Sequence, residues 1–238
     1  MLSYGQFCPL AQSTQLLCER WTLLIVRELI AGSTRFSELE KGLPQISPTM
    51  LSRRLKTLEH AGVITVNKEK AHTTYRLTQA GNELRPVVEL LGAWGHRWAR
   101  SDLSGGDLDA GLLMWDMRRS VNPEIFDGRE IVVQFLYPDA PRGAQAWWLV
   151  SRDGDTDLCL SDPGFDVDLV VQSSLKAMTR VWICEDTFND AVRAGSITVQ
   201  GDPELAGRLQ DWLGASPLSR LGASGKAPEL SWQAPDQA

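Results

Sequence analysis

The chain has 238 residues, of which 43% are hydrophobic and 23% are charged, and this excludes collagen, a long coiled coil and full disorder. No stretch approaches the roughly 18 apolar residues of a membrane span, and the N-terminus lacks the basic region and apolar core of a secretory signal, so we expect a cytoplasmic protein without membrane partners. Residues 1–100 hold 13 basic and 8 acidic residues, a net charge of +5, so residues 101–238 carry −11. This split suggests a half that binds a polyanion and a half that does not, with ordinary variation of surface charge as the alternative.

Helices, a hairpin and a further helix are predicted for the first hundred residues. Ser47 is a good N-cap and Pro48 suits a first helical turn, while Ala61-Gly62 ends that helix. The predicted elements are two helices within 10–31, a short helix over 35–43, a helix over 48–60, strands over 63–66 and 74–77, and a last helix reaching about residue 100. This order is typical of a winged helix-turn-helix.

The helix over 48–60 has two unlike faces. Leu51, Leu55 and Leu58 share one face at helical spacing. The opposite face carries Thr49, Arg53, Lys56 and His60. Such a face suits the DNA major groove, where arginine pairs with guanine. A solvated amphipathic helix shows the same pattern, but the basic residues between and within the two strands favour a second contact on one polyanion.

Residues 8–98 resemble the HxlR family of bacterial winged-helix transcriptional regulators, which is related to the MarR type. The matching segments are Cys8-Pro9, RWTLLIVREL at 20–29, RFSEL at 35–39, ISPTMLSRRL at 46–55, LEHAGVI at 58–64, YRLTQAG at 75–81 and Trp94-Gly95. The resemblance implies a homodimer on a palindromic operator of double-stranded DNA, a recognition helix at 48–60 and a basic wing. The prolines usual in the family's wing are absent, which puts its minor-groove contact in doubt.

We expect Thr49, Arg53 and Lys56 to approach bases and the flanking Arg54 to approach phosphate. In full, the predicted DNA-binding residues are Arg35, Ser47, Thr49, Ser52, Arg53, Arg54, Lys56, Lys68, Lys70, His72 and Arg76.

Cys8 precedes Pro9 where a first helix could begin. A thiolate at a helix N-terminus is stabilised by the backbone dipole and becomes more reactive. The family resemblance implies a sensor of oxidants or electrophiles here, and a packed thiol is the alternative.

The last helix of this half is apolar over a broad face that includes Leu84, Val88, Leu91 and Trp98. Dimer packing and packing within the domain both explain it.

The second half is predicted to be a separate α+β domain over 105–215, after a winged-helix domain over 1–104 and before a mobile tail over 216–238. Residues 166–213 resemble sterol-carrier-protein-type domains in DLVV at 168–171, Ser173, Leu175 and GSITVQGDP at 195–203. That resemblance implies a sheet covered by helices, often with an apolar cavity. We predict a pocket for an apolar small-molecule effector, lined by Trp115, Trp147, Trp148 and Trp182, with a plain core as the alternative.

Catalytic and metal-binding motifs are absent from the sequence. There is no Walker loop, no Gly-x-Ser-x-Gly and no Cys-x-x-Cys, so we expect neither an enzyme nor a cofactor or metal. The expected function is a dimeric repressor whose second domain senses an apolar molecule. The alternatives are a redox-sensing repressor switched through Cys8 with a structural second domain, and a lipid or acyl-ligand carrier.

Overall fold

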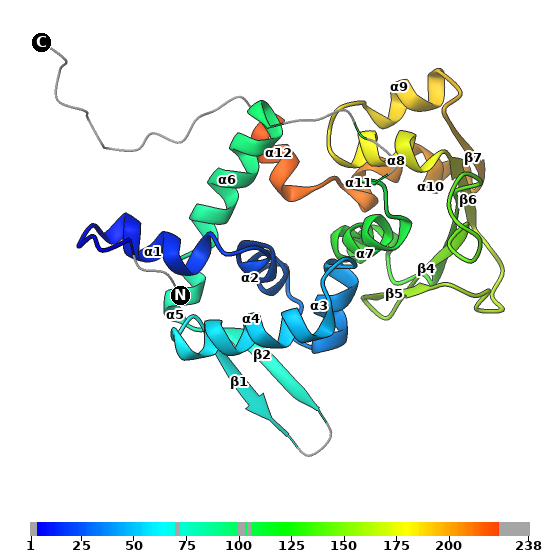
Figure 1. Cartoon of the computed structure of the whole chain (residues 1–238). Coiled ribbons are helices and arrows are strands. Elements are labelled where there is room, and N and C mark those ends of the chain that lie inside the picture. The colour runs from blue at the N-terminus through cyan, green and yellow to red at the C-terminus, as the bar shows by residue number, and fades with distance from the viewer. Residues whose placement is uncertain (1–3, 70–71, 100–102, 104–105, 224–238) are drawn as a thin grey trace, which may run out of the picture.

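The computed structural model describes residues 4–69, 72–99, 103 and 106–223. Two hydrophobic cores lie in two parts of the chain, and each part has its own β-sheet. Figure 1 shows the β1–β2 hairpin extending from the first part and the larger sheet on the far side of α7. Within the described residues, no helix is long and apolar enough to cross a membrane.

The first domain contains the predicted helices and hairpin. Its elements are α1 (Pro9–Leu17), α2 (Thr22–Ile30), α3 (Phe36–Gly42), α4 (Pro48–His60), β1 (Ile64–Lys68), β2 (Thr73–Leu77), α5 (Gln79–Asn82) and α6 (Arg85–Trp98). Ser47 caps α4, because its hydroxyl accepts a hydrogen bond from the Met50 N–H at 3.3 Å. The single last helix expected from the sequence is instead α5 and α6. Pro86, which lacks an N–H, stands in the first turn of α6 and suits a helix start better than a helix interior.

The inner face of α4 holds the helix to the first core. Leu51, Leu55 and Leu58 are at most 2% exposed and pack in one cluster with residues of α2, α3 and β1. Burying such side chains stabilises the fold by about 1.5–3 kcal/mol each. This packing leaves the opposite face of α4 pointing outward.

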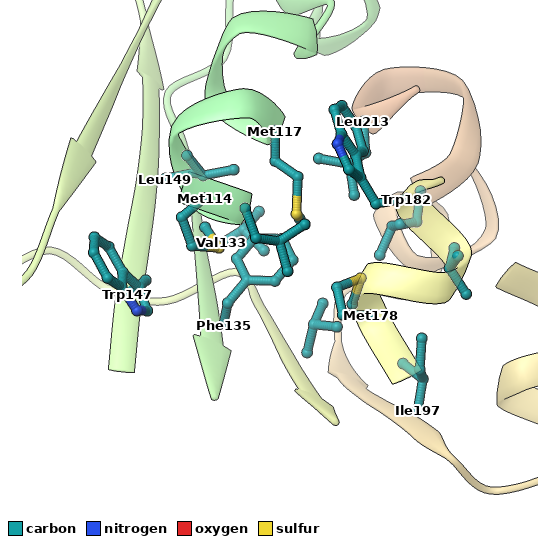
Figure 2. Packing of buried hydrophobic residues seen from close by; sticks show 14 of the residues in the cluster. Met114, Met117, Val133, Phe135, Trp147, Leu149, Met178, Trp182, Ile197 and Leu213 are labelled. Atoms are coloured by element: carbon teal, nitrogen blue, oxygen red, sulfur yellow. The ribbon is translucent and has the colours of Figure 1, made fainter. Parts of the chain in front are cut away.

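The second domain is built on a mixed five-stranded sheet. Its elements are α7 (Ala110–Ser120), the 3-10 helix η1 (Pro123–Phe126), β3 (Ile131–Leu136), β4 (Ala146–Arg152), β5 (Asp155–Cys159), β6 (Leu169–Ser173), α8 (Leu175–Trp182), α9 (Phe188–Arg193), β7 (Ile197–Gly201), α10 (Pro203–Gly207), α11 (Leu209–Leu213) and α12 (Pro217–Ala223). The strand order is β5-β4-β3-β6-β7, and β3 and β6 are parallel while the other neighbours are antiparallel. Figure 2 shows α7 and α8 packing their methionines against residues of this sheet.

The Gly-Asp-Pro sequence at the end of β7 has a local structural explanation. Gly201 has φ of +127°, and a Cβ there would lie 2.2 Å from the Asp168 carbonyl oxygen, so a side chain is excluded. Asp202 then caps α10 by accepting from the Glu204 and Leu205 N–H groups. After Asp202 the chain forms two short helices, α10 and α11.

The expectation of a mobile tail from residue 216 is wrong for residues 217–223. Residues Pro217–Ala223 form α12, which packs along α6 of the first domain. Small residues permit this close approach: a Cβ at Gly92 would meet Leu218 at 3.0 Å, and one at Gly222 would meet His96 at 2.6 Å. The rest of the expected tail, 224–238, lies outside the described residues.

Candidate nucleic-acid interface

The outer face of α4 presents a continuous set of exposed polar and basic groups. Thr49, Ser52, Arg53, Lys56 and His60 are all exposed and line one shallow surface. Among the described residues, no carboxylate lies within ion-pair distance of Arg53 or Lys56. These two cations are therefore available to an outside partner.

Arg54 and Ser47, two further predicted DNA contacts, are engaged within the protein. The Arg54 Nε donates to the Arg20 carbonyl oxygen at 3.1 Å, and its guanidinium forms an ion pair with Glu19. Arg54 thereby ties α4 to the turn before α2, because it lies on the flank of the helix and not on its outer face. Ser47 caps α4, so its hydroxyl already holds a backbone N–H.

The wing residues divide between the two faces of the hairpin. The register pairs Lys68 with Thr73 and Arg76 with Thr65, and side chains alternate along a strand. Lys68 therefore shares the face of Val66, which packs on the first core, and Arg76 projects from the other face. Both side chains are exposed.

The tip of the wing contains an acidic residue beside its histidine. The Glu69 N–H donates to the His72 carbonyl oxygen at 3.0 Å, and the His72 Nε2 lies 3.4 Å from the Glu69 carboxylate. The carboxylate offsets positive charge at this point. The predicted contact Lys70 lies outside the described residues.

Arg35 stands at the start of α3, where it is exposed and its backbone forms a β-bridge with Thr74. Its side chain borders a hollow that also includes Trp115 and Asp157 of the second domain. Arg35 is thus placed between the wing and the second domain.

Glu38 closes a capping box at the start of α3. Burial acts to raise the pKa of Glu38, but hydrogen bonds from the Thr34 and Arg35 N–H groups, at 2.7 and 2.9 Å, together with the charge of Arg35, hold that pKa below its usual range.

Cys8 occupies the N-cap position of α1 and is exposed. Its side chain makes no capping hydrogen bond. Exposed apolar side chains surround it in the sequence, with Phe7 96% exposed and Leu10 67% exposed.

The four tryptophans predicted to line one pocket do not all share one: Trp115 and Trp147 border a common pocket, Trp182 lines another, and Trp148 belongs to a separate cluster. Trp147 and Trp148 are consecutive on β4 and belong to different clusters on its two faces. Figure 2 shows Trp147 and Trp182 at opposite sides of the main core. Trp115 lies at the domain junction, where Lys41, Arg118 and Arg119 approach its ring centre at 4.9, 5.4 and 5.5 Å. The strand alternation that separates Trp147 from Trp148 was visible in the sequence, but the placement of the other two was not.

A buried carboxylate joins the two domains. Glu28 of α2 is fully buried. Its carboxylate lies 2.7 Å from the Arg27 guanidinium and 2.8 Å from that of Arg119 on α7, and it accepts a hydrogen bond from the Ser33 hydroxyl at 3.2 Å. A buried carboxylate is costly unless positive charge or hydrogen-bond donors lie beside it. Arg119 of the second domain therefore supplies part of the positive charge that neutralises Glu28 in the core of the first domain.

Asp116 extends this cluster on the α7 side. It forms an ion pair with Arg119. Burial raises the pKa of Asp116, and the nearby charges of Arg119 and Arg27 oppose that rise only in part. The sequence offered one signal for the junction: Glu28 lies among apolar residues on the face of α2 that includes Ile25 and Leu29.

An exposed basic helix beside a β-hairpin defines a winged helix-turn-helix transcriptional regulator. Residues 16–103 match the HxlR-like helix-turn-helix family. The chain is 36% identical over 101 residues to the HTH-type transcriptional regulator YvaP of Bacillus subtilis (strain 168), covering 41% of this chain and 94% of YvaP. It is 34% identical over 95 residues to the HTH-type transcriptional regulator YodB of the same organism, covering 38% and 85%. The solved reduced form of YodB from B. subtilis is 33% identical, covers 40% of this chain and 97% of that one, and has a TM-score of 0.35.

The chain belongs to the HxlR-like helix-turn-helix family. The family match ends at residue 103, so it concerns the first domain. The sterol-carrier likeness of the second domain stays a prediction.

Proposed function

We propose that the protein is a dimeric, ligand-controlled repressor that binds a specific operator, and that it is not an enzyme. In this proposal Thr49, Arg53 and Lys56 approach base edges in the major groove, while Lys68 and Arg76 of the wing approach phosphates. The observation that carries it is the outer face of α4, whose cations have no acidic partner among the described residues. The side chains that hold this helix in the fold lie on its inner face and, in the case of Arg54, on its flank.

An exposed apolar stripe on α6 supports the homodimer. Val87, Leu91, Trp94 and Trp98 follow each other at helical spacing and are 39–73% exposed, while the other side of α6 is covered by α12. Large exposed apolar patches mark interaction sites, and a twofold dimer presents two copies of α4 to a palindromic operator. The apolar face predicted for the last helix of the first domain therefore has two parts. Val88 is buried in the first core, whereas Leu91 and Trp98 are exposed and available to the partner subunit.

The position of the acidic domain is consistent with this arrangement. In Figure 1 its sheet lies beyond α3 and α7, away from the free end of the hairpin. A half with a net charge of −11 is repelled by DNA. The repulsion therefore favours approach of DNA from the side of α4 and the wing.

The domain junction supports control by a ligand. A ligand that binds one arrangement of the domains better than another shifts the population between them. The Glu28–Arg119 pair connects α2, which packs with α3 and α6, to α7 of the second domain. A displacement of α7 is therefore transmitted through this pair to the helices that position α4.

Fluorescence anisotropy with promoter duplex from the protein's own locus tests DNA binding. Binding is expected at about 50 mM salt and should weaken by about 10³-fold or more at about 200 mM. Failure to bind duplex DNA at the lower salt would contradict the proposal and favour the lipid-carrier alternative.

Sedimentation velocity tests the dimer. Leu91→Glu places a charge in the apolar stripe and should give a monomer with weaker operator binding. Val192→Glu, at a position 39% exposed on α9, is the matched control and should remain a dimer. If Leu91→Glu also sediments as a dimer, α6 is not the interface.

A second candidate is control through Cys8, which the exposure of its thiol and its place among exposed apolar side chains support. Oxidation there would alter the exposed surface at the start of α1. An oxidant should release operator DNA from the parent protein and not from Cys8→Ser. An equal response in both proteins would exclude Cys8 as the switch.

A further inference from the structure

A pocket of about 270 Å³ lies where the two domains and α12 meet. Its walls come from α2 and α6 of the first domain, α7 and α8 of the second, and α12. The apolar part of the wall includes Ile30, Val88, Trp182 and Leu218. The pocket is therefore built only when both domains and the C-terminal helix are in their places.

The polar part of the wall is arginine-rich, but its arginines are not equivalent. Arg27 and Arg119 are held by Glu28 and Asp116. Arg85, at the start of α6, is exposed and, among the described residues, has no carboxylate within ion-pair distance. A guanidinium in this state offers paired N–H donors to a carboxylate.

The remaining charges and the volume limit the ligand further. Glu89 and Asp116 also line the pocket, and they disfavour a second negative group. Since a water molecule occupies about 30 Å³ of liquid, the pocket holds roughly nine water volumes. That is room for a one-ring acid.

We propose that this pocket binds a small amphipathic monocarboxylate, with its apolar body against Val88, Trp182 and Leu218 and its carboxylate on Arg85. The proposal rests on the ligand-controlled function above, and it places the effector at the domain junction and not inside the second domain. Because the walls belong to both domains, occupancy favours the docked arrangement over any other.

Fluorine NMR of 4-fluorobenzoate with the full-length protein tests the site without DNA. Saturable binding is expected for the parent protein. Neutral 4-fluorobenzamide and cationic 4-fluorobenzylamine should bind at least about tenfold more weakly, because the paired charge-assisted hydrogen bonds from Arg85 to the carboxylate are lost. Equal binding of acid and amide would overturn the assignment of the carboxylate to Arg85.

Two pocket variants and one control locate the binding. Ala31→Trp fills the pocket from an exposed position at the end of α2 and should abolish binding. Arg85→Gln should weaken the acid at least about tenfold and remove its advantage over the amide. Arg220→Gln, exposed on α12 and outside the pocket lining, should bind as the parent does.

The results of these experiments test the existence of the binding site and its role in regulation separately. No saturable binding by the parent protein, or unchanged binding by both pocket variants, would overturn the site. If Ala31→Trp does not fold, Arg85→Gln decides alone. Binding with the expected variant pattern but no change in operator affinity would uphold the site and contradict the ligand-controlled function.

Discussion

Arginines on α4 and arginines at the domain junction carry the same charge in opposite settings. Arg53 is exposed and, in the described part of the chain, faces no acidic side chain. Arg119 is 14% exposed at its side chain and lies between two carboxylates, one of them fully buried. The difference teaches that the net charge of a region does not locate a DNA-binding face. A cation that is exposed and has no internal partner is available to a ligand. A cation that is paired with a buried carboxylate is required by the fold.

The largest effect is expected from Arg119→Ala. Among the described residues, this change leaves the buried Glu28 carboxylate with Arg27 and Ser33 as its partners. Removing one member of a buried ion pair costs about 3–5 kcal/mol, because the other charge stays buried. We expect the free energy of unfolding, measured with urea, to fall by about 3 kcal/mol or more.

Arg193→Ala is the matched control, since Arg193 pairs with Asp190 on the surface of α9. An exposed pair contributes about 0–1 kcal/mol. Equal losses in the two variants would remove the distinction between the two kinds of arginine. Glu28→Gln in the Arg119→Ala background should restore part of the lost stability.

Arg53→Ala and Arg54→Ala compare neighbours in the sequence with different partners. Arg53→Ala should lower operator affinity by about 1–3 kcal/mol and relax specificity at one base pair, with unfolding unchanged. Arg54→Ala removes the contacts to Glu19 and Arg20, so it should lower stability more than specificity. Anisotropy with operator and scrambled duplexes, alongside urea unfolding, measures both. A larger loss of specificity in Arg54→Ala would reverse the assignment of the two residues.

Lys68→Ala should weaken all duplexes about equally. A wing lysine that contacts phosphate releases one counterion, so its removal should reduce the slope of log affinity against log salt by about 1. Lys176→Ala, exposed on α8 of the acidic domain, should leave the slope unchanged. An unaltered slope in Lys68→Ala would mean that this face of the wing does not touch DNA.

The smallest effect is a pH dependence from Glu38. Its pKa is lowered in the folded protein, so the folded state binds protons less readily than the unfolded state does. The stabilisation is present above the ordinary pKa of 4.5 and is lost as pH falls through the lower folded value. Glu38→Gln should reduce stability at neutral pH by no more than about 1 kcal/mol and should flatten the dependence below pH 4.5. Identical pH profiles would contradict this role.

Local patterns predicted the winged-helix domain well. The spacing of Leu51, Leu55 and Leu58 fixed the inner face of α4, and Ser47-Pro48 marked its start. The polar outer face followed directly from helical geometry. Strand alternation likewise placed Trp147 and Trp148 on opposite faces.

Contacts between distant segments were not predictable in the same way. No local pattern indicates that Arg119 meets Glu28 or that Arg54 meets Glu19, because such pairs depend on how the elements pack. The composition after residue 216 resembles that of a tail, yet α12 is stabilised by its place against Gly92 and His96 of α6. The junction pocket was missed for the same reason, since its walls come from five helices in both domains.

The position of α12 has a consequence for synthesis of the protein. The N-terminal domain of a nascent chain folds first, and translation adds about 5–20 residues per second. The ribosome therefore needs on the order of ten seconds to pass from α6 to α12. During this interval a newly made α6 has neither its covering helix nor the complete junction. The first domain thus emerges with more of α6 uncovered than in the finished protein, and α12 completes the junction only after its own synthesis.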